Sequence, residues 1–122
     1  MAKGRLFLIH WNAEEAEALA APLRKDGWDV DIESEGGAQA RRRILAGVPD
    51  AVLVSLARLP SHGRETVQAL KSSKATRDLP IIFVGEPSDA MDKTRTRFRD
   101  ATFVTEEGLK RVIARYATPE DV

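Results

Sequence analysis

The sequence predicts a single α/β domain in which a parallel sheet is covered by helices on both faces. Five strand-like segments alternate along the chain with five stretches of helical period. Three of the strand-like segments are continuous apolar runs, which is typical of strands buried on both faces. Strands that alternate with helices pair in parallel through right-handed crossovers. A length of 122 residues allows one such core and is too short for two.

The five expected strands differ in character. The three apolar runs are 6–9, 51–56 and 81–84, with Ser55 as the one polar residue among them, and a shorter strand is expected at 102–104. Segment 28–33 instead alternates Trp28, Val30 and Ile32 with acidic residues, which is typical of a half-exposed edge strand. At this size the pattern favours the flavodoxin-like strand order 2-1-3-4-5, in which the second strand is an edge.

The first helix has the clearest signals. Asn12 and Glu15 form a capping-box pattern at its start. One apolar face follows at helical spacing, made of Ala16, Leu19, Ala20 and Leu23. Pro22 is expected to kink this helix or to end its regular bonding, and Gly27 marks its stop.

The remaining helices are placed by their caps and apolar faces. One is expected at 38–46, ending at Gly47, and another at 64–72 after a loop that begins at Pro60 and includes His62. A helix is expected to start near Ser88, and Met91, Thr94 and Phe98 share one face of it. Thr105 is expected to cap the last helix. The domain is predicted to cover 1–117, with 118–122 as a tail or the start of a linker.

The composition excludes several classes of function. Lys plus Arg and Asp plus Glu number 19 each, so the net charge is zero and no direct nucleic-acid binding is expected. The chain has no cysteine and only two histidines, which argues against a metal site or a thiolate nucleophile. No signal peptide or membrane-spanning run is visible, and we expect a cytoplasmic protein without a cofactor.

Three segments resemble the receiver domains of bacterial response regulators, the CheY-like domains. They are LFLIHWNAEEAEAL for the first strand and helix, PDAVLVSLARLPSHG for the third strand and its loop, and LPIIFVGE for the fourth strand. The proline and aspartate before the third strand, the proline before the fourth, and Gly63 eight residues after Ser55 also fall where receivers have them. The resemblance covers nearly the whole chain.

In receivers, a histidine kinase supplies a phosphoryl group to an aspartate at the end of the third strand. Acidic residues after the first strand hold Mg²⁺, and a Thr or Ser and a Lys bind the phosphoryl oxygens. The resemblance places these functions on His10 and Trp11, Ser55, Gly85 and Thr105. None of the five residues matches, so the resemblance implies a degenerate pseudo-receiver.

Each replacement has a chemical consequence. Mg²⁺ needs hard oxygen ligands, and the side chains of His10 and Trp11 supply none. Gly85 has no hydroxyl. Asn12 and Glu86 are polar groups expected near the pocket mouth, but one amide and one carboxylate supply only a few of the oxygen ligands that a metal ion needs. We expect Trp11 to plug the vacated pocket.

The function predicted from these residues is a non-catalytic signalling module that works by protein contact without phosphorylation. In receivers, the surface of the fourth helix, fifth strand and fifth helix commonly binds partners or a second copy. Here that surface would present Arg95, Arg99, Asp100, Lys110, Arg111 and Arg115. The expected partner is another protein, a fused output domain or a second copy of the chain.

A small-ligand sensor is the alternative. Doubly wound sheets bind ligands beyond the carboxyl ends of their strands, and Trp11 and Ser55 lie there. That reading predicts an open pocket, whereas the first predicts one filled by Trp11. An enzyme is not expected, because the rim lacks a paired acid and base, a metal cluster or an activated nucleophile.

Overall fold

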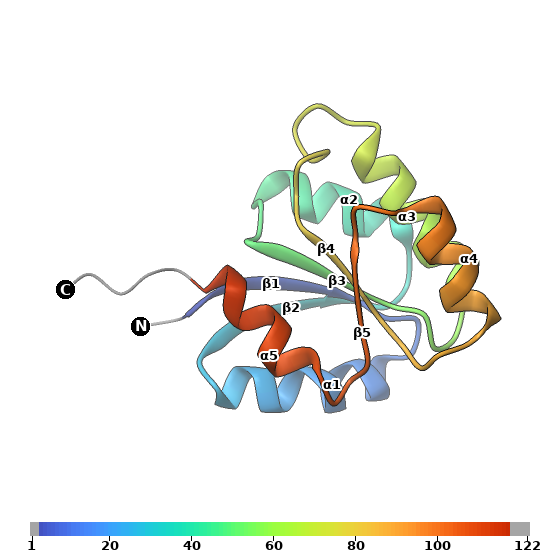
Figure 1. Ribbon diagram of the computed structural model, residues 1–122. Helices are drawn as coiled ribbons and strands as arrows, with labels where there is room; N and C mark the ends of the chain where they lie inside the picture. The colour runs from blue at the N-terminus through green and yellow to red at the C-terminus, as the bar shows by residue number, and fades with distance from the viewer. Residues whose placement is uncertain (1–2, 118–122) are drawn as a thin grey trace.

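The computed structural model describes residues 3–117 and has the predicted architecture (Figure 1). A five-stranded parallel sheet has the order β2-β1-β3-β4-β5, which confirms both the fold class and the edge position of the second strand. The elements are β1 Gly4–Ile9, α1 Ala13–Lys25, β2 Trp28–Glu33, α2 Gly37–Ala46, β3 Ala51–Ser55, α3 Pro60–Lys71, β4 Ile81–Val84, α4 Asp89–Arg97, β5 Thr102–Val104, α5 Leu109–Ile113 and a 3₁₀ turn Ala114–Tyr116.

The helices form two layers that bury opposite faces of the sheet. Figure 1 shows α1 and α5 on one side of the strands and α2, α3 and α4 on the other. Because successive side chains of a strand point to opposite faces, Leu6 and Leu8 pack with the first layer while Phe7 and Ile9 pack with the second. Strands β1, β3 and β4 are consequently buried on both sides, as their continuous apolar runs predict.

Helix α1 begins and ends at the expected residues. The Asn12 side chain accepts a hydrogen bond from the Glu15 N–H at 2.9 Å and so caps the helix. The helix runs past Pro22 to Lys25, and Gly27 follows with a φ of 105°, a backbone conformation that favours glycine. The predicted ending near Gly27 is therefore confirmed, although Pro22 does not stop the helix.

The starts of α3 and α5 differ most from the sequence prediction. Helix α3 begins at Pro60, so His62 belongs to its first turn rather than to a loop. Proline suits this position because its missing N–H would have no helical partner there. Thr105 does not cap α5 directly, because its hydroxyl accepts from the Gly108 N–H at 3.3 Å in the turn that precedes the helix. Residues 118–122, predicted to be a tail, lie outside the described range.

Close approach fixes helix α3 on the sheet and against α2. A Cβ built on Gly63 would lie 2.9 Å from Val54 Cγ1 on β3. One built on Gly37 at the start of α2 would lie 2.4 Å from Thr66 Oγ1 on α3. Neither distance leaves room for a side chain, so both contacts depend on glycine.

In the part of the chain described, no helix combines the length and apolar character needed to cross a bilayer.

Candidate functional site

The candidate site lies at the carboxyl ends of the parallel strands, where the sheet order brings β1, β3 and β4 together. His10 follows β1, Ser55 ends β3 and Gly85 follows β4. The register pairs Ile9 with Val54 and Ser55 with Val84. His10, Ser55 and Gly85 therefore meet at one edge of the sheet. Because the strands are parallel, their carboxyl ends lie at the same edge of the sheet, and this edge is the shared rim that the sequence predicts.

Ser55 is buried at 4% exposure, and its hydroxyl is used locally. The oxygen Oγ accepts a hydrogen bond from the Ala57 N–H at 3.1 Å, which stabilises the turn that leaves β3. This contact gives the side chain a structural role at the start of the β3–α3 loop.

The space beside Gly85 is apolar. A Cβ built on Gly85 would lie 3.3 Å from Leu56 Cβ and 3.6 Å from Met91 Cε. The Gly85 N–H donates to the Val104 carbonyl at 3.0 Å, so the backbone still links β4 to β5. Leu56 and Met91 belong to the hydrophobic core on this face, and the core therefore extends up to the rim at this position.

An ion pair between Glu15 and Arg58 crosses the rim, and sequence reasoning missed it. Arg58 Nε donates to Glu15 Oε1 at 3.2 Å and Arg58 Nη2 donates to Oε2, which makes a two-pronged contact between the β3–α3 loop and the first turn of α1. The hydrogen bond from Arg58 lowers the pKa of Glu15, and the same contact raises the pKa of Arg58. The only sequence signal is an arginine three residues after Ser55.

His10 lies beneath this ion pair at 3% exposure. Its Nδ1 accepts a hydrogen bond from the Asn12 N–H at 3.2 Å, which assigns the proton of the neutral ring to Nε2. Nε2 is 3.7 Å from Glu15 Oε1. Burial lowers the pKa of His10; Glu15 and Glu106 oppose that shift and Arg58 adds to it. The neutral ring therefore serves as a fixed support for the start of α1.

Two acidic residues line the cavity beside His10. A cavity of about 330 Å³ is lined by His10, Glu15 and Glu106 together with apolar atoms of α1. Glu106 follows Thr105, the residue predicted to stand at the lysine position of receivers. Among residues 3–117, no three His, Asp or Glu side chains are grouped closely enough to hold a metal ion.

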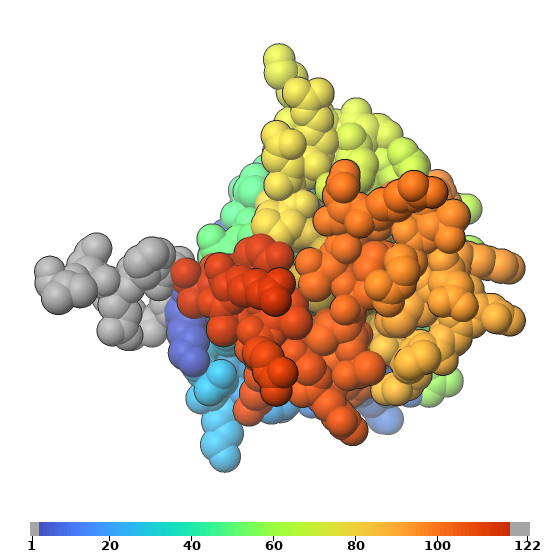
Figure 2. All heavy atoms as spheres, viewed as in Figure 1, coloured from blue at the N-terminus to red at the C-terminus, as the bar shows by residue number. Residues whose placement is uncertain are grey.

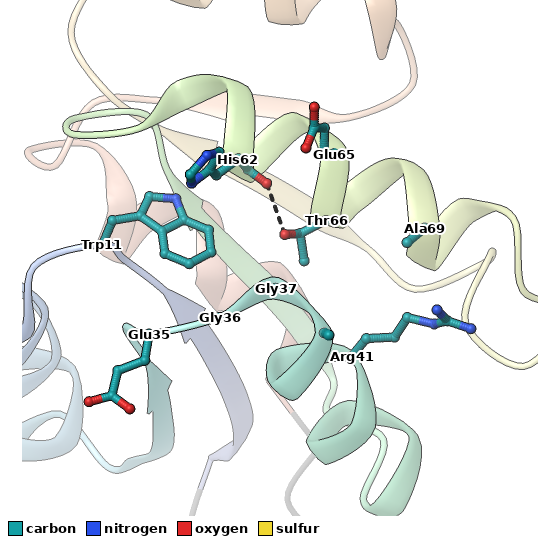
Figure 3. Close-up of a pocket in the computed structure, with 10 residues that line it drawn as sticks. Trp11, Glu35, Gly36, Gly37, Arg41, His62, Glu65, Thr66 and Ala69 are labelled. Atoms are coloured by element: carbon teal, nitrogen blue, oxygen red, sulfur yellow. Dashed lines mark hydrogen bonds between the residues drawn. The ribbon is translucent and has the colours of Figure 1, made fainter.

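Trp11 lines a separate cavity of about 450 Å³ between α2 and α3 (Figure 3). Its ring meets His62 edge-on, with centroids 5.7 Å apart, and its Nε1 is buried without a hydrogen-bond partner among the described residues. The other lining residues come from the β2–α2 connection, α2 and α3, namely Glu35, Gly36, Gly37, Ala38, Arg41, Glu65, Thr66 and Ala69. Ser55 does not line this cavity. The structure therefore separates Trp11 from Ser55, although the small-ligand prediction places both around one pocket.

Asn12 and Glu86, the two polar groups expected at the pocket mouth, have different surroundings in the structure. The Asn12 side chain is engaged as the cap of α1. Glu86 is exposed on the loop after β4. The structure thus brings His10, Ser55 and Gly85 to one edge, and adds Glu15, Arg58 and Glu106 to them.

The expected partner surface on α4, β5 and α5 is exposed and basic. Arg95 places its guanidinium 4.7 Å from the centroid of the half-buried Phe103 ring. Phe103 stacks in turn on Phe83 at 5.3 Å, which links this surface to the core. The other residues expected there are also exposed, namely Arg99, Asp100, Lys110, Arg111 and Arg115.

Comparison with known proteins agrees with this architecture. The chain is 33% identical over 87 residues to the response regulator PleD of Caulobacter vibrioides, and the match covers 70% of this chain and 18% of PleD. The chain therefore spans less than a fifth of the length of the curated relatives that it matches. No protein-family model matches the chain.

Solved receiver structures share the fold. The chemotaxis protein CheY4 of Vibrio cholerae superposes with a TM-score of 0.76 at 16% identity, covering 94% of this chain and 99% of that one. The receiver domain of sensor histidine kinase PA1611 from Pseudomonas aeruginosa, which holds a magnesium ion in its active-site cleft, gives 0.76 at 22% identity, covering 94% and 98%. This chain accordingly has the receiver fold.

Proposed function

We propose that this receiver-fold domain is a non-catalytic signal-transduction module of the two-component type, which acts through protein contact without being phosphorylated. The observation that carries the proposal is the state of the residue at the end of β3. Ser55 stands where a receiver has its phosphoacceptor aspartate, and its buried hydroxyl already bonds the Ala57 N–H. A histidine kinase forms an acyl phosphate on a carboxylate, and a serine hydroxyl cannot form that bond.

The two residues that follow β1 directly carry no carboxylate, which supports the same proposal. Mg²⁺ binding needs hard oxygen ligands, whereas this chain has an imidazole and an indole at those positions. The His10 ring is buried, and its Nδ1 is engaged with the Asn12 N–H. The two side chains that follow β1 directly therefore give a divalent ion no carboxylate ligand.

The Glu15–Arg58 ion pair gives a physical reason for independence from phosphorylation. It joins α1 to the β3–α3 loop with a cation that belongs to the protein itself. Arg58 thus provides a permanent guanidinium at this rim, and the Glu15 carboxylate balances its charge. We expect the rim to keep one arrangement rather than to switch between two.

We further propose that partners bind the basic surface of α4, β5 and α5. That partner is another protein, a fused output domain or a second copy of this chain. Arg95 and Phe103 provide a cation and an aromatic ring in contact with each other, a combination enriched at protein interfaces.

The test is a two-dimensional amide NMR titration with Mg²⁺ and then with beryllofluoride, which mimics an acyl phosphate. The indole signals of Trp11 and Trp28 report the rim and the edge strand, because Trp28 begins β2 at the other end of the sheet. We expect no saturable shift for Ser55 or for the Trp11 indole at millimolar concentrations. Saturable movement at the ends of β1, β3 and β4 would overturn phosphorylation independence.

The cavity beside Trp11 supports a second candidate function, the binding of a small polar ligand. The observation that favours it is the buried Trp11 Nε1, which has no acceptor among the described residues. A ligand oxygen in the cavity would satisfy this donor. A downfield shift of the Trp11 indole proton on screening of small carboxylates and amides, lost in Trp11→Phe, would support it, and an unchanged signal would count against it.

A further inference from the structure

Among residues 3–117, the cations that form ion pairs all lie in the first half of the chain. The salt bridges between described residues use lysines and arginines at or before position 58, namely Lys3, Arg5, Arg24, Arg43 and Arg58. The lysines and arginines from Arg64 to Arg115 form none with the described carboxylates. The second half therefore carries cations whose charge the described part of the chain does not neutralise by contact.

Several of these cations converge on one cavity. Its volume is about 320 Å³, and it lies between the α3–β4 connection and the residues that lead from α4 to β5. Figure 2 shows these two segments, yellow and orange, next to each other on the surface. The charged lining residues are Lys71, Arg77, Asp78, Arg97, Arg99 and Asp100.

Neutral contacts hold the cations at the cavity. Lys71 Nζ donates to the Arg77 carbonyl at 3.2 Å, and Arg97 donates to Gln68 Oε1 at 3.4 Å. The Arg97 guanidinium also lies 5.2 Å from the centroid of Phe98. Phe98 is 8% exposed and supplies an apolar wall to the same cavity. The site thus offers uncompensated positive charge beside an aromatic ring.

We propose that this cavity binds an acidic segment of a partner protein, in which carboxylates flank an apolar side chain. Guanidinium groups match carboxylates with paired hydrogen bonds, and the cations here outnumber the two aspartates. The apolar side chain would contact the apolar wall that Phe98 and Ala101 give to the cavity. A cavity of this size, near the lower end of the range for ligand pockets, suits one or two side chains rather than a large ligand.

This inference rests on the proposed protein-contact function and specifies the chemistry of the partner. Arg99 and Asp100 belong both to this cavity and to the proposed α4–β5–α5 surface, so a bound segment would continue onto that surface. The cavity lies at the amino ends of β4 and β5, whereas Ser55 lies at the carboxyl end of β3. A binding experiment and a phosphorylation experiment therefore report opposite ends of the sheet, and each can fail alone.

The experiment is an amide NMR titration of the whole chain with the capped peptide Glu-Glu-Leu-Glu-Glu, with Gln-Gln-Leu-Gln-Gln as the neutral peptide. We expect saturable shifts at 77–79 and 97–101 with the acidic peptide only. The double variant Arg77→Gln and Arg99→Gln should bind about five- to tenfold more weakly. The matched control Lys25→Gln and Arg42→Gln removes the same charge from exposed positions on α1 and α2 and should bind as the parent chain does.

Three results would overturn the inference. The first is an absence of saturable shifts at these residues. The second is equal weakening in the two double variants, which would indicate attraction to net charge alone. The third is saturable binding of pyrophosphate at the cavity without binding of the acidic peptide, which would make the site one for a small anion instead of a protein segment.

Discussion

His10 is a titratable side chain whose burial should make the stability of the domain depend on pH. Burial lowers the pKa of His10 below the ordinary value of 6.5, because the charged ring loses hydration. The carboxylates of Glu15 and Glu106 face the ring and oppose this effect, while Arg58 reinforces it. Since the folded pKa is lower than the unfolded one, the unfolded chain binds the proton first as the pH falls.

The expected outcome is a free energy of unfolding that decreases as the pH drops below about 6.5 and that stops decreasing, as far as His10 contributes, below its folded pKa. The variant His10→Asn keeps an acceptor near Nδ1 for the Asn12 N–H but does not titrate. Urea unfolding at several pH values between 5 and 8 should show a shallower fall for this variant. His62→Asn, on the exposed start of α3, is the control and should retain the parent slope. Equal slopes for parent and His10→Asn would contradict the prediction.

Single residues also mark the limit of what the sequence could predict about the site. His10, Ser55 and Gly85 could be placed at one edge because each follows a recognisable apolar strand. The Glu15–Arg58 pair could not, since its members are 43 positions apart and Arg58 lies in a loop whose path the pattern leaves open. The direction of the Trp11 ring depends on the contact between α2 and α3, which only tertiary packing determines.

At the scale of elements, strands were predicted better than helix ends. Continuous apolar runs give strands β3 and β4 to within one residue, because burial on both faces leaves no other use for such runs. The sequence prediction starts α3 at Arg64, four residues after the observed start at Pro60. The prediction assigns Pro60 to a loop, although proline is also favoured in the first turn of a helix.

The contact between β3 and α3 leads to a prediction about packing. In Gly63→Ala the added methyl group would lie 2.9 Å from Val54 Cγ1, and neither the helix nor the strand can move far in a buried layer. We expect a loss of about 1–3 kcal/mol in the free energy of unfolding, the usual cost of overpacking. Urea denaturation with an unchanged m-value would measure it.

The control for this variant is Gly36→Ala, since a Cβ on Gly36 meets nothing within 4 Å. It should cost less than about 1 kcal/mol, because alanine typically loses about 1 kcal/mol against the best N-cap residues and glycine is already slightly worse than they are. Combining Gly63→Ala with Val54→Ala should relieve the contact, so the double variant should be more stable than the sum of the two single changes implies. A Gly63→Ala domain as stable as the Gly36→Ala domain would show that this contact adapts.

The molecule as a whole is unevenly packed from the centre of the sheet to its edge. Residues of β3 and β4 are almost fully buried, with Val52, Leu53 and Val54 at 0% exposure. All three residues of β5 are only half-buried, and α5 is a short helix that continues into a 3₁₀ turn. Local opening requires the least energy where few apolar contacts are lost, so β5 and α5 should open before the central strands do.

Hydrogen exchange would measure this difference. We expect amides of β1, β3 and β4 to exchange only through global unfolding, and amides of β5 and α5 to exchange at least about tenfold faster, which corresponds to a difference of roughly 1.4 kcal/mol in opening free energy. Because the proposed partner surface includes both elements, a bound partner should slow their exchange selectively. Uniform protection across all five strands would contradict this gradient. It would also mean that the partner surface is as rigid as the core, so that binding could change the contacts of this surface but could not make it more rigid.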